Sequence, residues 1–599
     1  MTESRRHPGA RPAGGRWPAL GTSAALALAS LGVGSDARAQ TFTVDFSSKL
    51  GAPTYRASGF IYGLSEDATQ PPQHFVSDIK TQFLRVGGAQ LGCPSGGWVN
   101  STSNYTRRWN TVQAYYGVAK AVGAKVILLV HDLWGADLVC TVNEFPGDGG
   151  NWTRFNTFIN QVVNDAKAAG MTGSDVIWDL WNEPDCCGFW GDRAQSQYLE
   201  MWKRSYQAVR AALPSAIISG PSSSGQPAGG NGWFTAYLDY IKSNNVIPDY
   251  LSWHQLPGPD PNSSKSTADS WLSSRGITVK GYQINEYGSP GGQQGAAGSA
   301  WYIGRLDRLG IDGARANWGM YGGLWDTMGE LVVNGSGALG AWWVYKRYAD
   351  TTGQRVAISS NNSQWDGAAG TDSSKANAII VLGNNLSSGG PYTITLNLTR
   401  LDQASYLVAN NQVRALVERI PETGRTPVSA PTTVSNQNYA VTNNQASITI
   451  SWGSANDSYA VTLTGSTGGT GTGGTASGGV ATGGKATGGT PTGGTSTGGK
   501  ATGGTSTGGT TTTSGGASTG GRATGGALVP GGTGGVSGIG GSNVGGGGGQ
   551  GGGGEETCNC RTAGGTSTGA GWLGALGLLL LARARRRTAG RQLSAGKPA

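Results

Sequence analysis

The sequence of 599 residues predicts a (β/α)8 barrel, followed by an antiparallel β-sandwich and a long low-complexity tether. From residue 59 to about 350, short apolar runs alternate with amphipathic stretches, a pattern typical of repeated βα units. From about 351 to 464 the apolar residues recur with a period of two, which indicates antiparallel strands. Beyond Thr464 this hydrophobic pattern stops.

The barrel region contains eight candidate strands. Their ranges in chain order are Gly59–Tyr62, Phe83–Val86, Lys125–Val130, Val176–Trp181, Ala216–Ser219, Tyr250–Trp253, Gly281–Asn285 and Gly313–Trp318. Between them lie helices such as Arg154–Ala169, in which apolar residues recur at helical spacing. Eight parallel strands that close on themselves form a barrel whose active site lies at the carboxyl ends of the strands.

The β-sandwich is predicted from alternating segments such as Tyr392–Leu398 and Tyr459–Leu463. We expect the early strand Thr41–Phe46 to join this sandwich, so that both ends of the folded region clasp the barrel. The expected domains are therefore a catalytic barrel at 41–350 and a sandwich at 351–464.

The two flanking segments are not expected to belong to the folded region. Residues 1–40 combine arginines, the apolar run Ala24–Leu31 and small residues at a cleavage spacing, which predicts a removable secretion signal. The alternative is an N-terminal anchor or tail, but the apolar run is too short to span a bilayer. Residues 465–556 repeat Gly/Thr-rich units that lack the apolar content to offset their ordering entropy, so we expect a flexible linker.

The last segment, 557–599, has three features in order. Cys558 and Cys560 precede the apolar run Gly571–Ala582, and the basic cluster Arg583–Arg587 follows it. This order resembles the C-terminal sorting tag of many myxobacterial exported proteins. The resemblance implies processing by sorting machinery and retention at the cell surface or outer envelope. A weak permanent membrane helix is the alternative, since the run is shorter than the ~20 residues of a stable span.

Charge and cysteine content exclude some classes of function. The formal net charge of +9 comes from the terminal segments, and the body at 41–464 is slightly negative, which argues against nucleic-acid binding. Cys93 and Cys140 each follow a predicted strand on the same rim, and the sequence leaves open whether they form a disulfide bond. None of the four histidines lies at zinc-ligand spacing with a cysteine, and we expect neither a metal nor a cofactor.

Two glutamates carry the chemistry that the sequence predicts. Glu183 follows the apolar run of the fourth strand within Trp178–Asp185, and Glu286 ends the seventh strand within Gln283–Gly288. Cleavage of a glycosidic bond needs one carboxyl group to protonate the leaving oxygen and another to attack the anomeric carbon or to activate water. Because the carboxyl ends of the strands meet at one mouth, the two motifs together predict a glycosidase.

These motifs also resemble those of the clan A glycoside hydrolases, most closely glycoside hydrolase family 39, across roughly 41–464. The Asn-Glu pair that ends strand four in that clan supplies the acid/base, and the glutamate that ends strand seven is the nucleophile. The resemblance therefore implies that Glu183 is the acid/base, that Asn182 contacts the sugar 2-hydroxyl and that Glu286 is the nucleophile.

Further residues at the predicted rim are candidates for substrate binding or for orienting the carboxylates. Arg85 ends strand two and is placed to keep Glu286 ionised, with a barrel-mouth salt bridge as the alternative. His131 and His254 close the third and sixth strands, with satisfied structural histidines as the alternative. Trp318, at the end of strand eight, either contacts the sugar or belongs to the core.

The sequence departs from the family pattern after the strand-six histidine. A nearby tyrosine is common there in the family, whereas this chain continues with Gln255 and Leu256. Tyr287 and Tyr282 are therefore the candidates for orienting Glu286.

Together these features predict a secreted, surface-displayed retaining glycoside hydrolase acting on a plant or microbial polysaccharide or oligosaccharide. The family resemblance favours a β-xyloside. A non-catalytic carbohydrate-binding protein and a transglycosylase are the alternatives. The linkage and the choice between exo and endo action stay open.

Overall fold

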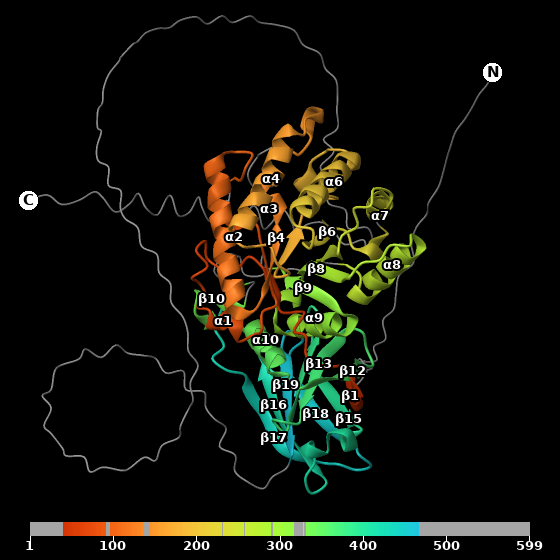
Figure 1. The fold of residues 1–599 in the computed structure, drawn as a ribbon. Coiled ribbons are helices and arrows are strands. Elements are labelled where there is room, and N and C mark those ends of the chain that lie inside the picture. The colour runs from red at the N-terminus through yellow and green to blue at the C-terminus, as the bar shows by residue number, and fades with distance from the viewer. Residues whose placement is uncertain are drawn as a thin grey trace, which may run out of the picture. The chain divides into compact units, whose positions relative to one another are not determined.

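The computed structural model describes residues 40–91, 96–136, 144–230, 232–256, 258–288, 292–316, 328 and 331–465. In this part of the chain a closed barrel of parallel strands is followed by a sheet of nine strands (Figure 1). The predicted barrel and the mainly antiparallel second region are therefore confirmed.

The barrel contains the eight predicted strands in chain order, and each pairs in parallel with its neighbours. They are β2 (Gly59–Ile61), β3 (Phe83–Val86), β4 (Lys125–Leu129), β5 (Val176–Asp179), β6 (Ile217–Ser223), β7 (Tyr250–Gln255), β8 (Gly281–Tyr287) and β9 (Ile311–Arg315). Strand β5 is shorter than predicted and β8 is longer. Glu183 therefore lies in a loop after its strand, whereas Glu286 lies within β8.

Helices cover the outside of the barrel (Figure 1). The long ones are α2 (Thr102–Val122), α4 (Thr153–Ala168), α6 (Gln195–Ala212), α7 (Gly232–Ser243), α8 (Pro261–Ser274), α9 (Ala296–Leu309) and α10 (Gly340–Asp350). The short ones are α1 (His74–Ser77), α3 (Val130–Trp134) and α5 (Cys187–Trp190). Helix α4 begins and ends one residue before its predicted bounds, and it buries the predicted apolar face.

The second region is one continuous sheet in the order β17-β16-β19-β14-β13-β12-β1-β15-β18. Its strands are β1 (Gln40–Lys49), β12 (Gln354–Ser360), β13 (Trp365–Asp372), β14 (Asn377–Asn384), β15 (Tyr392–Thr399), β16 (Gln412–Ile420), β17 (Thr432–Ala440), β18 (Ala446–Trp452) and β19 (Ser458–Gly465). Alternate residues of these strands share one buried apolar cluster, as a β-sandwich requires. A minor two-stranded pair, β10 (Val332–Val333) with β11 (Gly337–Ala338), lies outside this sheet.

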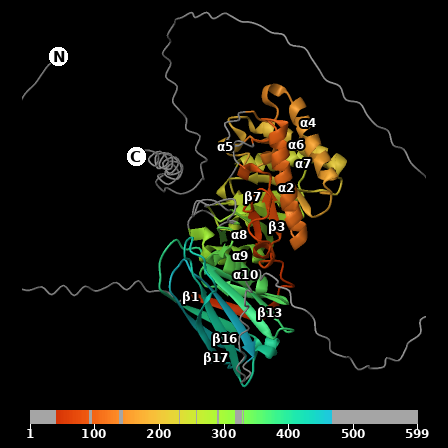
Figure 2. The ribbon, with the colours of Figure 1, turned by 90° about the vertical axis from the view of Figure 1, so that its left-hand side faces the viewer.

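Strand β1 joins this sheet, as its alternating pattern predicts, and Figure 2 shows it among the strands from the end of the described chain. It pairs antiparallel with β12 but parallel with β15, so the expectation of a purely antiparallel sandwich is wrong for this pair. The reason is connectivity. No hairpin turn links β1 to β15, so nothing forces them to run in opposite directions.

Helix α9 packs closely against strands β13 and β14 of the sheet. A Cβ atom added at Gly383 in β14 would lie 2.3 Å from the carbonyl oxygen of Ala297, so glycine permits this approach. Asp366 in β13 accepts hydrogen bonds from Arg308 of the same helix. Farther along, Arg347 of α10 binds both carboxylate oxygens of Glu418 in β16, each at 2.8 Å. The sheet therefore supports one side of the barrel.

Several expectations concern parts of the chain outside the described residues. These are the secretion signal, the linker at 465–556, the sorting segment at 557–599 and the pairing of Cys93 with Cys140. Cys186 is disulfide-bonded. Where the structure describes the chain, it contains no helix with the length and apolar character needed to cross a bilayer.

Candidate active site

Three residues other than glycine adopt left-handed backbone angles at the carboxyl ends of barrel strands. The φ angle is 54° at Tyr62, 41° at Glu183 and 56° at Ser222. Such conformations each cost about 1–3 kcal/mol and persist only where the surroundings hold them. The backbone amide of Glu183 donates to the carbonyl oxygen of Ser222 at 2.9 Å, which fixes the loop after β5. The barrel mouth thus contains three residues in strained backbone conformations.

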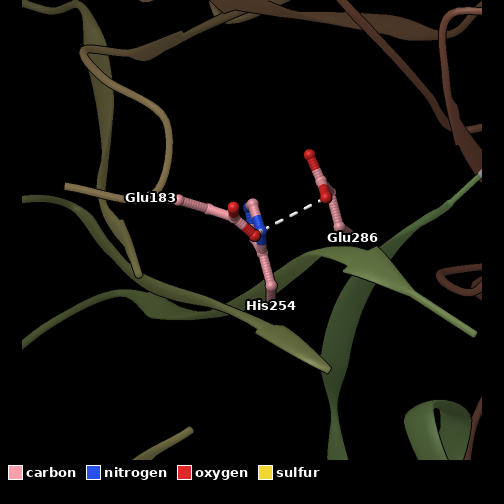
Figure 3. Close-up of side chains that lie close together, drawn as sticks. All are labelled: Glu183, His254 and Glu286. Atoms are coloured by element: carbon pink, nitrogen blue, oxygen red, sulfur yellow. Dashed lines mark hydrogen bonds and ion pairs between the residues drawn. The ribbon is translucent and has the colours of Figure 1, made fainter. Parts of the chain in front are cut away.

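The two candidate catalytic glutamates converge at this mouth, with His254 between them (Figure 3). One carboxylate oxygen of Glu183, one of Glu286 and Nδ1 of His254 all lie within 4.8 Å of one another. Retaining glycosidases hold their carboxyl groups about 5–5.5 Å apart, and inverting ones hold them about 6.5–9.5 Å apart. The separation of these oxygens is below both ranges and is nearer to the retaining one.

His254 contacts both glutamates through one ring nitrogen. Its Nδ1 lies 2.7 Å from Oε1 of Glu183 and 3.2 Å from Oε2 of Glu286. A register shift in β7 sets His254 opposite Glu286 in β8. Burial lowers the pKa of His254 to about 4, although the charge of Glu286 raises it. The imidazole is therefore neutral near pH 7, and its Nδ1 lies within hydrogen-bond distance of both carboxylates.

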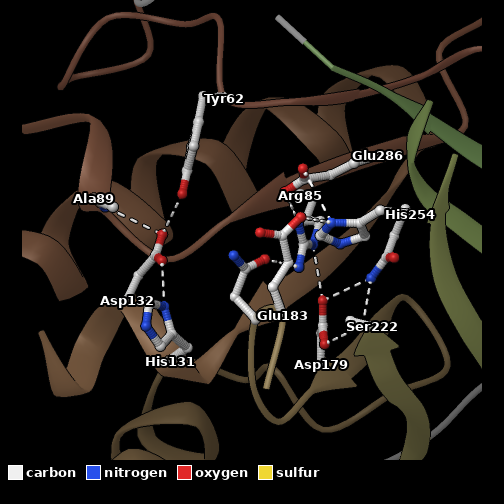
Figure 4. Close-up of polar contacts among 12 residues, drawn as sticks. Tyr62, Arg85, Ala89, His131, Asp132, Asp179, Glu183, Ser222, His254 and Glu286 are labelled. Atoms are coloured by element: carbon white, nitrogen blue, oxygen red, sulfur yellow. Dashed lines mark hydrogen bonds and ion pairs between the residues drawn. The ribbon is translucent and has the colours of Figure 1, made fainter. Parts of the chain in front are cut away.

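Arg85 is the second residue that holds Glu286, as the sequence predicted (Figure 4). Its Nη1 donates to Oε1 of Glu286 at 2.5 Å, its Nη2 to Oδ1 of Asn182 at 2.8 Å, and its Nε to Oδ2 of Asp179 at 2.8 Å. The guanidinium is fully buried. One arginine thus fixes one glutamate and the asparagine that precedes the other.

A layer of polar residues below Arg85 was not singled out from the sequence. Asn285 donates through Nδ2 to Oδ2 of Asp179 at 2.8 Å and to Oγ of Ser222 at 2.7 Å. The hydroxyl of Ser222 in turn donates to Oδ1 of Asp179 at 2.7 Å. These bonds orient the carboxylate that holds Arg85. Asn285 lies in the same motif as Glu286, which was a usable signal, whereas nothing local to Ser222 indicates its role.

His131 makes no hydrogen bond to either glutamate in the described part of the chain, and its role in substrate binding stays a prediction. Its Nε2 lies 2.7 Å from the carbonyl oxygen of Ala136, and its Nδ1 lies 3.2 Å from Oδ1 of Asp132. Strand β4 ends at Leu129 and the chain turns at once into α3, which carries His131 away from the strand end. Asp132 also accepts a hydrogen bond from the hydroxyl of Tyr62 at 2.7 Å. His131, Asp132 and Tyr62 therefore form a second polar group, apart from the two glutamates (Figure 4).

Neither predicted tyrosine orients Glu286. The hydroxyl of Tyr287 donates to the carbonyl oxygen of Ala57 at 2.6 Å and contacts Tyr345. The pairing register of β8 shifts between Ile284 and Tyr287, so the strand is irregular at this point. Tyr282 contacts Asp269. Arg85 and His254 hold Glu286 instead. Trp318 lies outside the described residues.

The two glutamates differ in proton affinity. Burial, followed by the negative charge of Asp185, raises the pKa of Glu183 to about 8. Burial also raises the pKa of Glu286, to about 7, but His254 and Arg85 oppose that rise. The acid/base of a retaining glycosidase must hold its proton while the nucleophile is ionised. The order of these two values is the one that the predicted roles require, with Glu183 as the acid/base and Glu286 as the nucleophile.

A (β/α)8 barrel with two such glutamates at its mouth is the architecture of a glycoside hydrolase. Comparison with known proteins agrees. Residues 170–281 match the sequence model of "Glycosyl hydrolases family 39", a stretch that includes Glu183 and His254. This match supports an assignment to that family.

Relatives and solved structures extend the likeness. The chain is 24% identical over 454 residues to a 3-O-alpha-D-galactosyl-alpha-L-arabinofuranosidase of Bifidobacterium longum subsp. longum, covering 65% of this chain and 38% of that protein. It is 27% identical over 86 residues to a beta-xylosidase of Geobacillus stearothermophilus, covering 14% of this chain and 16% of the relative. The solved structure of N2152 from Neocallimastix frontalis has a TM-score of 0.58 and 26% identity, covering 71% of this chain and 100% of that one. The chain thus spans well under half of these curated relatives, whose names support a glycosidase acting on O-glycosyl compounds.

Proposed function

We propose that this chain is a retaining glycoside hydrolase in which Glu286 is the nucleophile and Glu183 the acid/base. The single observation that carries the proposal is the convergence of the two carboxylates within 4.8 Å at the barrel mouth. In the first step, Glu286 bonds to the anomeric carbon while Glu183 gives its proton to the leaving oxygen. In the second step, ionised Glu183 takes a proton from water, the water oxygen bonds to the anomeric carbon, and Glu286 leaves.

The surrounding residues have defined tasks in this scheme. Arg85 and His254 fix the two oxygens of Glu286, so that the carboxylate is oriented before substrate arrives. Oδ1 of Asn182 accepts from Arg85, which directs its amide nitrogen toward donation to the sugar 2-hydroxyl. Arg85 therefore couples the nucleophile to a substrate contact.

The substrate class that we propose is a pentoside of a plant or microbial polysaccharide or oligosaccharide. The names of two relatives support this class, one an arabinofuranosidase and the other a xylosidase. A β-xyloside and an α-L-arabinofuranoside are the two forms to test first. The intact pair of glutamates argues against a non-catalytic binding protein, and a transglycosylase would differ only in its acceptor.

The test is hydrolysis of aryl pentosides and polysaccharides by the purified full-length chain, with the anomeric form of the first product followed by NMR. We expect retention of configuration. The Glu183→Gln and Glu286→Gln variants should lose several orders of magnitude in kcat while their thermal unfolding stays near wild type. The matched control is Glu200→Gln on the outside of α6, which should keep full activity. An inverted product, or unchanged turnover in either variant of the pair, would contradict the assignment.

We also propose that the enzyme is exported and held at the outer cell surface. The order of features in the sequence supports this location: a signal at 1–40, a linker at 465–556 and a sorting segment at 557–599. Deletion of 557–599 should release active enzyme into the medium, and the mature protein should end near Cys558 by mass spectrometry. Equal release of the full-length and truncated chains would refute the sorting role without affecting the catalytic proposal.

A further inference from the structure

The three side chains at the centre of the site form a set of donors suited to a divalent transition metal. Glu183 and Glu286 offer carboxylate oxygens and His254 offers an imidazole nitrogen, all within 4.8 Å of one another (Figure 3). Two carboxylates and one imidazole suit Zn²⁺, whereas Mg²⁺ and Ca²⁺ prefer oxygen ligands alone. Three protein ligands also leave a fourth position for water, as zinc sites with an open face do.

The distances allow one ion to reach all three atoms. Ligands at about 2.1 Å from a tetrahedral zinc ion lie about 3.4 Å from each other. Nδ1 of His254 lies 2.7 Å and 3.2 Å from the two carboxylate oxygens. Small rotations of the glutamate side chains therefore suffice to bring the three ligand atoms around one ion.

The charges around the three side chains also favour a cation. Glu183, Glu286 and Asp179 are joined through Arg85 and His254, so this network contains three carboxylates against one guanidinium. When ionised, the carboxylates leave a net negative charge in a site that excludes most water. The His254 side chain is fully buried, and those of Glu286 and Glu183 are 5% and 12% exposed. A dication offsets this charge, and the partial exposure of Glu183 marks the side from which it enters.

The outer contacts of the ligands are consistent with moderate affinity. Arg85 holds Oε1 of Glu286, which leaves Oε2 facing His254. Nε2 of His254 is buried without a hydrogen-bond partner in the described part of the chain. In the tautomer with its proton on Nε2, the ring presents the lone pair of Nδ1 to a metal. The same missing partner withholds the support that metal-binding histidines usually receive.

We propose that Glu183, Glu286 and His254 form an inhibitory Zn²⁺ site that coincides with the catalytic centre. The ion binds the two carboxylates that the proposed reaction uses, so metal and substrate exclude one another. The inhibition rests on the proposed glycosidase function, whereas the metal binding does not. This ion is an inhibitor and not a cofactor of the reaction.

The binding test titrates zinc chloride into the full-length, metal-stripped protein by calorimetry. Wild type should bind one more Zn²⁺ per chain than His254→Ala, or bind it at least about tenfold more tightly, since even outer-shell changes cost about 10–100-fold. His74→Ala, at an exposed histidine, is the matched control and should behave as wild type. Zinc sites elsewhere in the chain contribute equally to all variants.

Glu183→Gln and Glu286→Gln keep the shape of the site and serve if His254→Ala does not fold. Each should also weaken the same binding event. Equal stoichiometry and affinity in wild type and in the folded variants would overturn the proposal. Zinc should further inhibit glycoside hydrolysis competitively, with reversal by a chelator and no inhibition by Mg²⁺. If the protein binds zinc through these residues but hydrolyses no glycoside, only the proposed function fails. Activity that zinc leaves unchanged refutes the inhibitory role.

Discussion

Replacing Arg85 with methionine should destabilise the fold and shift the pH dependence of catalysis together. The substitution removes the partner of Asp179 and of Glu286, whose side chains are 0% and 5% exposed. Breaking a buried ion pair by removal of one member costs about 3–5 kcal/mol. The free energy of unfolding of a typical protein is only about 5–15 kcal/mol, so this loss is large. Urea unfolding at pH 7 should show the loss as a lower midpoint with an unchanged slope.

The catalytic effect of the same substitution has a definite sign. Arg85 lowers the pKa of Glu286, which burial raises to about 7. Without the guanidinium the pKa rises further, so the acid limb of kcat/KM should move to higher pH. Loss of orientation should reduce kcat as well, because a misplacement of ~1 Å costs about 100-fold. Arg85→Lys keeps the charge but not the three-way fork, and should shift the limb less.

A matched control separates stability from chemistry. Arg347 binds Glu418 with two hydrogen bonds between α10 and the sheet, and neither residue belongs to the site. Arg347→Met should therefore lower the free energy of unfolding while leaving the acid limb in place. If a folded Arg85→Met protein keeps the wild-type acid limb, the role assigned to Arg85 is wrong.

Three further predictions follow from the same structure. The plot of kcat/KM against pH should be bell-shaped. Activity should fall below about pH 7, where Glu286 gains a proton, and above about pH 8, where Glu183 loses one. A broad optimum near pH 5 would contradict this prediction. The pKa of Glu183 is higher in the folded chain than in the unfolded chain, so its protonation stabilises the fold. This contribution to the free energy of unfolding is complete below the ordinary pKa of 4.5 and is lost as the pH rises through about 8. Chemical unfolding across this range should show a flatter profile for Glu183→Gln. Finally, a 40–465 fragment should retain activity and thermal transition, whereas removal of 353–464 should expose the apolar face of α9 and cause aggregation on size-exclusion chromatography.

The barrel could be predicted because each of its strands is marked by a short segment of the sequence. Each apolar run marks one strand, and eight repeats of the same unit leave few ways to close a sheet. The place of Glu183 and Glu286 then followed from the rule that strand ends converge. The parallel pairing of β1 with β15 could not be predicted, since alternation identifies a strand and its buried face but not its neighbour.

Tyr287 lies at the end of a stretch of β8 in which the alternation of side chains fails. Asn285 and Glu286 are consecutive, yet both belong to the network around Arg85 and Asp179, because the pairing register of β8 shifts between Ile284 and Tyr287. The hydroxyl of Tyr287 reaches Ala57 and Tyr345 outside the barrel mouth. Residue type and spacing alone therefore could not place the Tyr287 hydroxyl.

The two histidines show what residue spacing in the sequence cannot predict. His131 and His254 each follow an apolar run, so their local sequences predict the same position at the rim. Strand β4 ends before His131, whereas β7 continues through His254 with a register shift that sets it opposite Glu286. That difference depends on how each strand pairs with its neighbours and how the following loop packs. The proton affinities have the same origin, because burial is the main cause of the raised pKa at both Glu183 and Glu286. Sequence motifs can therefore nominate the reacting carboxylates, but the packed barrel decides which of them holds its proton.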